Sequence, residues 1–448
     1  MTKIWDLKAK IREVSPDIVT LPQYLITQGY STQGIGKVFD PRNVDEQNDQ
    51  KSWSVPYHKT DKKYYVPALG EPAEGRYQLK DTKAMVEKVI SEAIAKGMTK
   101  AEANAEANLK VRPTSEIIDV PDNAYNDGAN ILQSKDILKQ LSKKGEPFFF
   151  AVGIAKPHLP FVAPKKYWDL YKTSEMPLAP FQEQSTNPIA VAYHNAGEIR
   201  AYTDMPADLA KTKQKDFGYT ISPAKQQELI HAYYAAISYT DALVGDLLNT
   251  LDSLGLSKKT IVVLWGDHGW HLGDHNLWCK HSNFEEATRA PLIISAPGID
   301  PNSTQSLTEH VDVFPTLCDL AGLPIPSQLQ GKSLKPVMLN PVLAVKKYST
   351  SQYPRSGLDE ESGRTGFVEA NTMGYSIRDG QYRFTIWMKN GFRSTRKYAE
   401  KDEIGMELYD YKADPLETKN VAGEKNYASV AAKMRSDLLN YFNSQVIQ

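Results

Sequence analysis

Residues 260–265 read TIVVLW, an uninterrupted apolar run that leads directly into the polar stretch GDHGWHLGDHNLWCKHSN at 266–283. An apolar run without alternation is typical of a strand buried on both faces of a parallel sheet. Two further runs have the same character, PFFFAVGI at 147–154 and PLIISAP at 291–297. Together they predict three strands in the core of an α/β protein.

A long helix is predicted just before residues 260–265. Ser222 is a cap residue followed by Pro223 at the first helical position, and Gly255 is a stop signal. Apolar residues at helical spacing predict the face that packs on the core: Leu229, Tyr233, Ile237, Val244, Leu248 and Leu251. The order strand, helix, strand predicts a layered core with helices on both faces of the sheet.

The pattern changes after about residue 340. Residues 373–388, MGYSIRDGQYRFTIWM, alternate and carry Asp379-Gly380 at their centre, which is a strong hairpin signal. Residues 427–443 predict a terminal helix. We therefore predict a core domain over residues 1–340 and a C-terminal subdomain with an antiparallel sheet over residues 341–448.

Residues 75–120, approximately, are predicted to be an insertion in the core domain. Within them, the segment 81–109 is rich in Ala, Glu and Lys. Its apolar residues recur at helical spacing, which predicts a surface helix or a pair of helices: Val86, Val89, Ile90 and Ile94.

The composition excludes several classes of protein. Lys plus Arg is 53 and Asp plus Glu is 54, a net charge of −1, so a nucleic-acid partner is not expected. No stretch approaches the roughly 20 apolar residues of a membrane-spanning helix. The only two cysteines, Cys279 and Cys318, exclude a disulfide framework and are expected to be small core residues.

The chemistry-bearing residues follow predicted strands. Asp267 and His268 come directly after residues 260–265, at the strand end where open α/β sheets place ligands, and suit a divalent cation. Lys280 lies slightly further along and can place a cation near an anionic substrate. The alternative is a surface loop with histidines and a capping aspartate, and the spacing matches no HExxH zinc motif.

Two other strand ends carry basic groups. Lys156-Pro157-His158 follows residues 147–154, and its Lys and His could bind or protonate an oxyanion, although a Pro-rich surface turn is the alternative. Gly34-Ile35-Gly36-Lys37 ends another predicted strand but lacks the spacing of a phosphate-binding loop. Together these strand ends predict a site for a small anion of high charge density beside a metal ion.

These residues carry a resemblance that extends along nearly the whole chain. The chain resembles the type I sulfatases of the alkaline-phosphatase-like superfamily, and most closely their iduronate-2-sulfatase branch. The stretch GDHGWHLGDHNLWCKHSNF at 266–284 and ELYDYKADPLETKN at 407–420 are the most specific matches. Others are TLPQYLITQGY (20–30), GIGKVFDP (34–41), SWSVPYH (52–58), FFFAVGIAKPHLPF (148–161), HVDVFPTLCDLAGLPIP (310–326) and SQYPR (351–355).

The resemblance implies a three-layer sandwich around a mostly parallel sheet and a sulfatase that acts on a sulfated sugar with one calcium ion. In that family a cysteine within C-x-P-S-R is oxidised to formylglycine, which attacks the sulfur. By the same resemblance, Asp267 and His268 would bind the metal. Lys37 would hold the formylglycine, and His158 and Lys280 would contact the sulfate. Trp270 could line the sugar subsite.

Two departures from the family pattern qualify these expectations. No C-x-P-S-R or S-x-P-S-R occurs in the 448 residues, so this chain contains no nucleophile. We therefore expect a chain shortened at its N-terminus, inactive and poorly soluble as it stands. Its parent is expected to be periplasmic, secreted or lysosomal. The second departure is Asp40, since the iduronate enzymes have a histidine there; another sulfated sugar is an equal expectation.

Two alternatives remain open. The chain could be a non-catalytic, sulfatase-like protein that binds an anion or a sugar through Lys37, His158 and Lys280. It could also be a phosphatase or phosphodiesterase of the same superfamily, although such enzymes use two metal ions, and the pair Lys37 and Lys280 fits a one-metal sulfatase site better.

Overall fold

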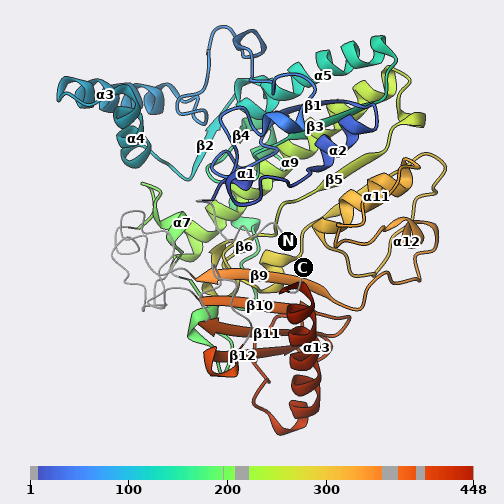
Figure 1. The fold of residues 1–448 in the computed structure, drawn as a ribbon. Helices are drawn as coiled ribbons and strands as arrows, with labels where there is room; N and C mark the ends of the chain where they lie inside the picture. The colour runs from blue at the N-terminus through green and yellow to red at the C-terminus, as the bar shows by residue number, and fades with distance from the viewer. Residues whose placement is uncertain (1–8, 195, 207–220, 356–371, 390–398, 447–448) are drawn as a thin grey trace.

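The computed structural model describes residues 9–194, 196–206, 221–355, 372–389 and 399–446 (Figure 1). Short strand pairs form the sheets of the first three hundred residues. Two pairs are parallel, β1 (Ser31–Gly36) with β3 (Phe148–Gly153) and β2 (Ser115–Ile118) with β4 (Phe161–Pro164). Two are antiparallel, β5 (Val262–Trp265) with β8 (Leu292–Ser295) and β6 (His271–Leu272) with β7 (Trp278–Cys279).

Helices flank these strands, which confirms the predicted α/β class. The longest is α9, and none of the described helices is long and apolar enough to cross a membrane. The helices of this part are α1 (Ile11–Val14), α2 (Leu21–Thr27), α3 (Lys80–Ala95), α4 (Lys100–Lys110), α5 (Asn126–Lys144), α6 (Lys165–Trp168), α7 (Gly197–Arg200), α9 (Pro223–Ser253), α10 (Glu285–Thr288), α11 (Val313–Leu320) and α12 (Lys335–Leu339).

Local sequence signals account for several helix ends. The Ser222 hydroxyl accepts a hydrogen bond from the Lys225 backbone N–H, and Pro223 stands at the first position of α9, as predicted. Gly255 adopts a φ of +67° just beyond the end of α9. The segment 81–109 forms the helix pair α3 and α4, which projects from the core in Figure 1.

The core lies between α5, α9 and the strands. Ile35 of β1 packs with Ile137 and Leu141 of α5, so this helix covers the β1–β3 pair. A larger cluster joins Phe161 of β4 to the middle of α9. Cys279 is part of that cluster, and Cys318 is also buried; both are free thiols, which confirms their prediction as small core residues.

The predicted core face of α9 is only partly correct. Leu229 and Leu251 are buried, but Ile237 and Leu248 are exposed. The buried face instead runs through small side chains and a tyrosine: Ala232, Ala235, Ala236, Tyr239 and Leu243. Alanine allows the helix to approach β4 closely, so the face of α9 is set by what it packs on rather than by its largest apolar residues.

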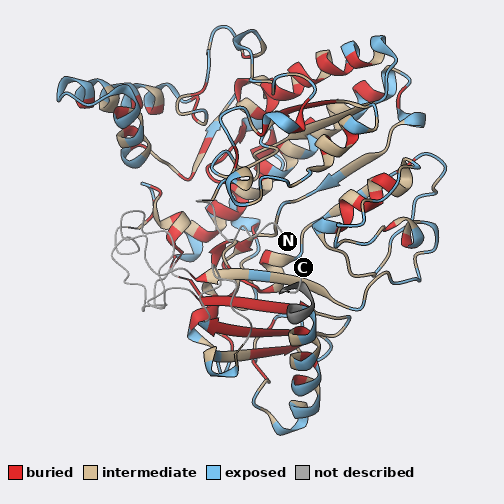
Figure 2. Cartoon of the chain, viewed as in Figure 1, coloured by how far each residue is buried: buried red, intermediate tan, exposed pale blue. Residues whose placement is uncertain are grey.

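The expectation that the apolar strands are buried on both faces is also wrong. Every residue of β3 is half-buried, and β5 carries exposed residues (Figure 2). The exposed fractions of Leu264 and Trp265 on β5 and of Ile293 on β8 are 37%, 47% and 60%. The reason is topological: among the described residues, β5 and β8 pair only with each other, and β3 pairs only with β1. Strands in such small units leave faces and edges uncovered.

The C-terminal part is a four-stranded antiparallel sheet with a helix packed on it (Figure 1). The Asp379-Gly380 hairpin is confirmed, because β10 pairs with β11 in the register that places Arg378 opposite Arg383. Met434 and Leu438 of the terminal helix pack on Ile377 and Phe384 of the sheet. The sheet order is β12 (Glu403–Asp410), β11 (Tyr382–Lys389), β10 (Thr372–Arg378) and β9 (Ser349–Arg355), and the helix is α13 (Ala428–Val446).

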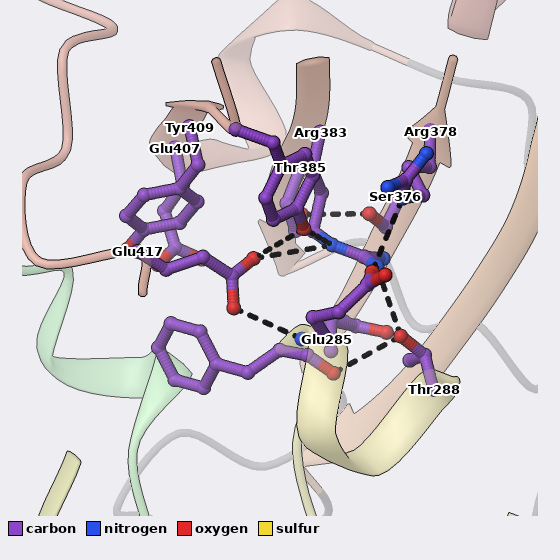
Figure 3. A network of polar contacts seen from close by, with 12 residues as sticks. Glu285, Thr288, Ser376, Arg378, Arg383, Thr385, Glu407, Tyr409 and Glu417 are labelled. Carbon is purple, nitrogen blue, oxygen red and sulfur yellow. Dashed lines mark hydrogen bonds and ion pairs between the residues drawn. The ribbon is translucent and has the colours of Figure 1, made fainter. Parts of the chain in front are cut away.

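A buried polar network joins this sheet to α10 (Figure 3). Arg383 is 4% exposed at its side chain; its guanidinium forms ion pairs with Glu285 and Glu417 and donates to the Thr288 hydroxyl at 2.9 Å. The Tyr411 hydroxyl donates to Glu417 at 2.6 Å. Residues more than a hundred positions apart are thus joined through one buried cation.

Glu407 makes the stability of the C-terminal sheet depend on pH. This carboxyl accepts hydrogen bonds from Trp387 Nε1 at 2.7 Å and Tyr409 OH at 2.8 Å, and burial raises its pKa to about 7. A raised carboxyl pKa stabilises the fold fully below the unfolded value near 4.5, and that stability is lost as the pH rises through 7.

We expect Glu407→Gln to remove this loss, which is roughly 3 kcal/mol for a shift of this size. Denaturant unfolding at pH 5 and pH 8 measures it. The decrease in unfolding free energy from pH 5 to pH 8 should become about half as large in this variant. It should not vanish, because burial also raises the pKa of Glu417 to about 7. Glu87→Gln, at an exposed position on α3, is the control and should follow the unsubstituted chain. An equal pH 5 to pH 8 difference in all three proteins would contradict the assignment.

Candidate functional site

The ends of β1 and β5 bring Lys37 and Asp267 together. The Lys37 Nζ lies 3.9 Å from Asp267 Oδ2, and the Asp267 side chain is 67% exposed. Lys37 is anchored by its backbone N–H, which donates to the Gly153 carbonyl at 3.0 Å. Gly153 ends β3 beside it, so β1, β3 and β5 all end close to Lys37.

Only a glycine fits at position 153, because the Lys37 backbone lies directly against it. A Cβ at this position would lie 2.1 Å from the Lys37 carbonyl carbon, far inside van der Waals contact. We expect Gly153→Ala to displace Lys37 and to cost about 1–3 kcal/mol of unfolding free energy or more. Gly245→Ala is the matched control, since nothing lies within 4 Å of its added Cβ and a helical alanine should stabilise the protein by about 0.5–1 kcal/mol. Thermal and chemical unfolding distinguish the two, and an equal response would refute the steric argument.

Hydrogen bonds to Asp127 and from Lys156 hold together the loop that carries His158. Lys156–Pro157 and Leu159–Pro160 are cis peptide bonds, and the Asp127 carboxylate accepts hydrogen bonds from the backbone N–H groups of Ala155 and Lys156. The Lys156 ammonium donates to the carbonyls of His158 and Pro160 at 2.7 and 2.6 Å. Lys156, predicted as a possible anion ligand, therefore has a structural role inside the loop.

Glu198 of α7 contacts three basic side chains, those of His158, Lys280 and His281. Its carboxylate accepts hydrogen bonds from Lys280 Nζ at 2.8 and 2.9 Å and from His281 Nε2 at 2.8 Å, and it lies 2.9 Å from His158 Nε2. Lys280 Nζ and His158 Nε2 are 3.1 Å apart. A single, largely shielded carboxylate thus orients the lysine and both histidines.

These contacts change the protonation of the groups. Burial would raise the pKa of Glu198, but the hydrogen bonds from His158 and His281 and the charge of Lys280 outweigh it and hold the Glu198 pKa well below its usual value. Burial lowers the pKa of His158, while Glu198 opposes that change. His158 Nδ1 donates to the Leu159 carbonyl at 2.7 Å, so Nε2 is the atom that faces the site.

Trp270 forms an aromatic wall of the site. Its ring lies edge-on to His158, with ring centroids 5.9 Å apart, and stacks against His268 at 5.9 Å. The Lys280 Nζ lies 5.0 Å from its centroid, a cation–π distance. Trp270 therefore links the two basic groups to the strand end that carries His268.

Asp40 lies at the rim of the cavity, paired with Arg42. The Arg42 guanidinium donates to both carboxylate oxygens, at 2.9 and 2.7 Å, and its hydrogen bonds lower the Asp40 pKa. A wide cavity opens here, lined by residues of both charges: Asp40, Arg42, Arg76, Arg112, His158, Glu198, Asp267, His268, Lys280 and His281. Cationic groups from separate elements thus face one space, as an anion site requires.

Asp267 and His268 supply only part of the coordination sphere of a metal ion. His268 Nδ1 donates to the Gly269 carbonyl at 2.8 Å, which leaves Nε2 free and 3.6 Å from Asp267 Oδ2. This is the orientation of a metal-binding imidazole. Calcium takes about six to eight oxygen ligands, and within the described ranges no third His, Cys, Asp or Glu joins these two. The described residues therefore do not by themselves fit a calcium ion, and no chemical step is assigned to one.

The structure brings together seven of the residues named from the sequence, and Lys156 is the exception. Lys37, Asp267 and His268 lie at one corner, and Trp270 joins them to His158 and Lys280, with Asp40 at the rim. Sequence reasoning missed Glu198, His281 and Tyr353, whose hydroxyl contacts His281 Nδ1. Glu198 is in a four-residue helix within an irregular stretch, where no periodicity marks it. His281 follows Lys280 in the motif stretch 266–283, so its position in the sequence was a signal that could have identified it.

Comparison with known proteins identifies similar chains. A model of the family described as Sulfatase matches residues 8–323. The iduronate 2-sulfatase of Mus musculus is 30% identical over 486 residues, which cover 97% of this chain and 82% of the mouse protein. The Homo sapiens iduronate 2-sulfatase is 31% identical over 473 residues, covering 94% and 79%.

Solved structures show the same fold. The protein BT4656, in complex with its substrate D-glucosamine-2-N,6-O-disulfate, aligns with a TM-score of 0.64 at 20% identity, covering 99% of this chain and 84% of BT4656. The phosphonate monoester hydrolase of Agrobacterium radiobacter aligns with a TM-score of 0.62 at 20% identity, covering 96% and 81%. At this identity the likeness shows a common fold for enzymes with different substrates.

Proposed function

Because this chain belongs to the sulfatase family of sulfuric ester hydrolases, we propose that it forms the substrate-binding and leaving-group side of a sulfatase that acts on a sulfated carbohydrate. The observation that carries the proposal is the cluster of Lys280, His158 and Glu198 beside Trp270. The family generally uses a metal ion, and Asp267 and His268 would supply two of its ligands.

Each residue of the cluster has a role in the proposed reaction. Lys280 and Lys37 offset the negative charge of the sulfate group as the S–O bond breaks. His158 presents Nε2 to the leaving oxygen and donates a proton to it. Glu198 does not touch the substrate in this scheme; it orients Lys280 and His158 and favours the protonated form of the imidazole.

Trp270 supports a carbohydrate as the substrate. An aromatic ring beside charged hydrogen-bonding groups can pack on the apolar face of a sugar while those groups bind its polar substituents. The mixture of Arg42, Arg76 and Arg112 with Asp40 around the cavity suits a ligand that carries both anionic and hydroxyl groups. The likeness to iduronate 2-sulfatases supports a sulfated sugar, and Asp40 leaves its identity open.

A second candidate function is binding without hydrolysis. The 448 residues contain no C-x-P-S-R or S-x-P-S-R, and this observation favours a sulfatase-like protein that binds a sulfated sugar as an anion. Both candidates use Lys280 and His158 to hold the sulfate group. From the resemblance we also propose that the protein acts outside the cytoplasm, either in the periplasm, in a lysosome or as a secreted protein.

One experiment separates the candidates. The chain is joined behind a segment that carries C-x-P-S-R, its cysteine conversion is verified by mass spectrometry, and hydrolysis of an aryl sulfate and a panel of sulfated sugars is measured. Calcium-dependent release of sulfate supports the enzyme. Saturable binding of the sugars without release supports the binding protein. Neither release nor binding would refute both, and faster turnover of phosphate than of sulfate esters would favour a phosphatase.

A further inference from the structure

A second cluster of ligating side chains lies apart from the cavity described above. One potential ligand atom from each of His275, Glu286 and Glu417 lies within 4.8 Å of the other two. His275 and Glu286 come from the segment that follows β6, and Glu417 from the loop that follows β12. His275 and Glu417 are 2% and 1% exposed, so the cluster is in the protein interior.

Two atoms of this cluster lack partners. His275 Nδ1 and Glu286 Oε2 are buried, and neither has a hydrogen-bond partner. Buried polar atoms are nearly always paired in native proteins, so an unpaired one points to an ion or a water that completes it. The His275 ring stacks on Phe284 at 4.3 Å and lies edge-on to Phe181, and these aromatic rings supply no acceptor for its nitrogens.

The two carboxylates of the cluster share a limited positive charge. Arg383 forms an ion pair with Glu417, but its guanidinium also pairs with Glu285. A divalent cation between Glu286 and Glu417 would supply positive charge to both carboxylates.

The adjacent His271 does not offer an open ligand. His271 Nδ1 is paired with Asp274, and Nε2 lies 2.7 Å from the Ser282 hydroxyl, so both ring nitrogens are engaged. Glu417 can still accept a ligand bond, since its Oε2 accepts one hydrogen bond among the described residues, from the Glu285 backbone N–H at 2.9 Å (Figure 3). The open atoms therefore belong to His275, Glu286 and Glu417.

We propose that His275, Glu286 and Glu417 bind a divalent transition-metal ion of the zinc type, distinct from the ion expected at Asp267 and His268. One imidazole and two carboxylates are a donor set that zinc accepts at about 2.0–2.1 Å. One ligand atom from each side chain lies within 4.8 Å of the others, so the three side chains would move toward one another when the ion binds. The ion ties the segment that carries the motif residues 266–283 to the loop beyond β12. Its role is to stabilise this junction, and the proposal does not depend on the proposed function.

The test is zinc binding to the whole chain after treatment with EDTA and desalting. We expect one Zn²⁺ per chain by elemental analysis and a rise in the melting temperature when Zn²⁺ is restored. His275→Phe keeps the ring stack on Phe284 and removes the ligand, and Glu286→Gln keeps the shape and removes the charge. Each should weaken zinc binding by at least about 10- to 100-fold. Asp267→Asn and His310→Gln, an exposed histidine, are the controls and should retain the ion.

The stability of the variants without metal keeps the proposal falsifiable. In EDTA, His275→Phe and Glu286→Gln should melt at or above the temperature of the unsubstituted chain, because the first removes an unpaired buried polar atom and the second removes a buried charge. If either variant fails to fold, Co²⁺ added to the unsubstituted chain provides the readout, through a visible absorption band that Zn²⁺ displaces. The proposal is overturned if the EDTA-treated chain binds neither Zn²⁺ nor Co²⁺. It is also overturned if His275→Phe and Glu286→Gln bind zinc as tightly as the unsubstituted chain does.

Discussion

Replacing Arg383 by alanine should lower the free energy of unfolding by about 3–5 kcal/mol. The guanidinium is buried and pairs with Glu285 and Glu417, so its removal takes the cation from Glu417 and leaves Glu285 paired with Arg378 alone. It also removes hydrogen bonds to Thr288 and to Tyr411. Urea unfolding followed by circular dichroism and by tryptophan fluorescence measures the loss, and it should appear in both signals because the network joins α10 to the C-terminal sheet.

A matched set of variants separates charge from geometry. Arg383→Lys keeps a cation but not the planar fork that reaches several acceptors, so an intermediate loss is expected. Lys433→Ala, which removes a surface ion pair with Asp437, should cost about 0.3–0.5 kcal/mol. If Arg383→Ala were no more destabilising than Lys433→Ala, the buried network would have no structural importance.

Replacing Lys280 by alanine should reduce kcat/KM for a sulfate ester by about 100- to 1,000-fold in the enzyme completed with a C-x-P-S-R segment. The ammonium lies between Glu198, His158 and the ring of Trp270, and it is the cation best placed to offset charge on the leaving side of the sulfate. Steady-state hydrolysis measures the effect. In the chain without the added segment, the same variant should weaken the binding of a sulfated sugar.

Two further variants test how Lys280 acts. Glu198→Gln keeps the shape of the carboxylate and removes its charge, so the His158 pKa should fall. Because His158 acts as the general acid, the alkaline limb of the pH–rate profile should then move to lower pH. Because Glu198 is a positioning residue, kcat should change more than KM. Lys258→Ala, on an exposed turn, is the control and should leave the rate unchanged. A rate unaffected by Lys280→Ala would refute the assigned role.

Local patterns determined a large part of the fold and of the site. The capping of α2 and α9, the Asp379-Gly380 hairpin and the strands that precede Lys37 and Asp267 all follow from signals within a few residues. They could be predicted because capping, turn geometry and strand periodicity depend on neighbours in the sequence. The motif stretch 266–283 then placed four of the seven predicted site residues on one loop.

Only the tertiary structure decided the rest. Glu198 joins Lys280 across 82 positions, and Glu417 pairs with Arg383 and approaches His275 from a distant loop. The buried face of α9 and the exposure of Trp265 likewise depend on which elements pack beside them. The sequence by itself thus determined the elements and the residues at their ends. The side chains that meet, and their charge states, were decided by packing, because burial and pairing are properties of three-dimensional neighbours rather than of adjacent residues.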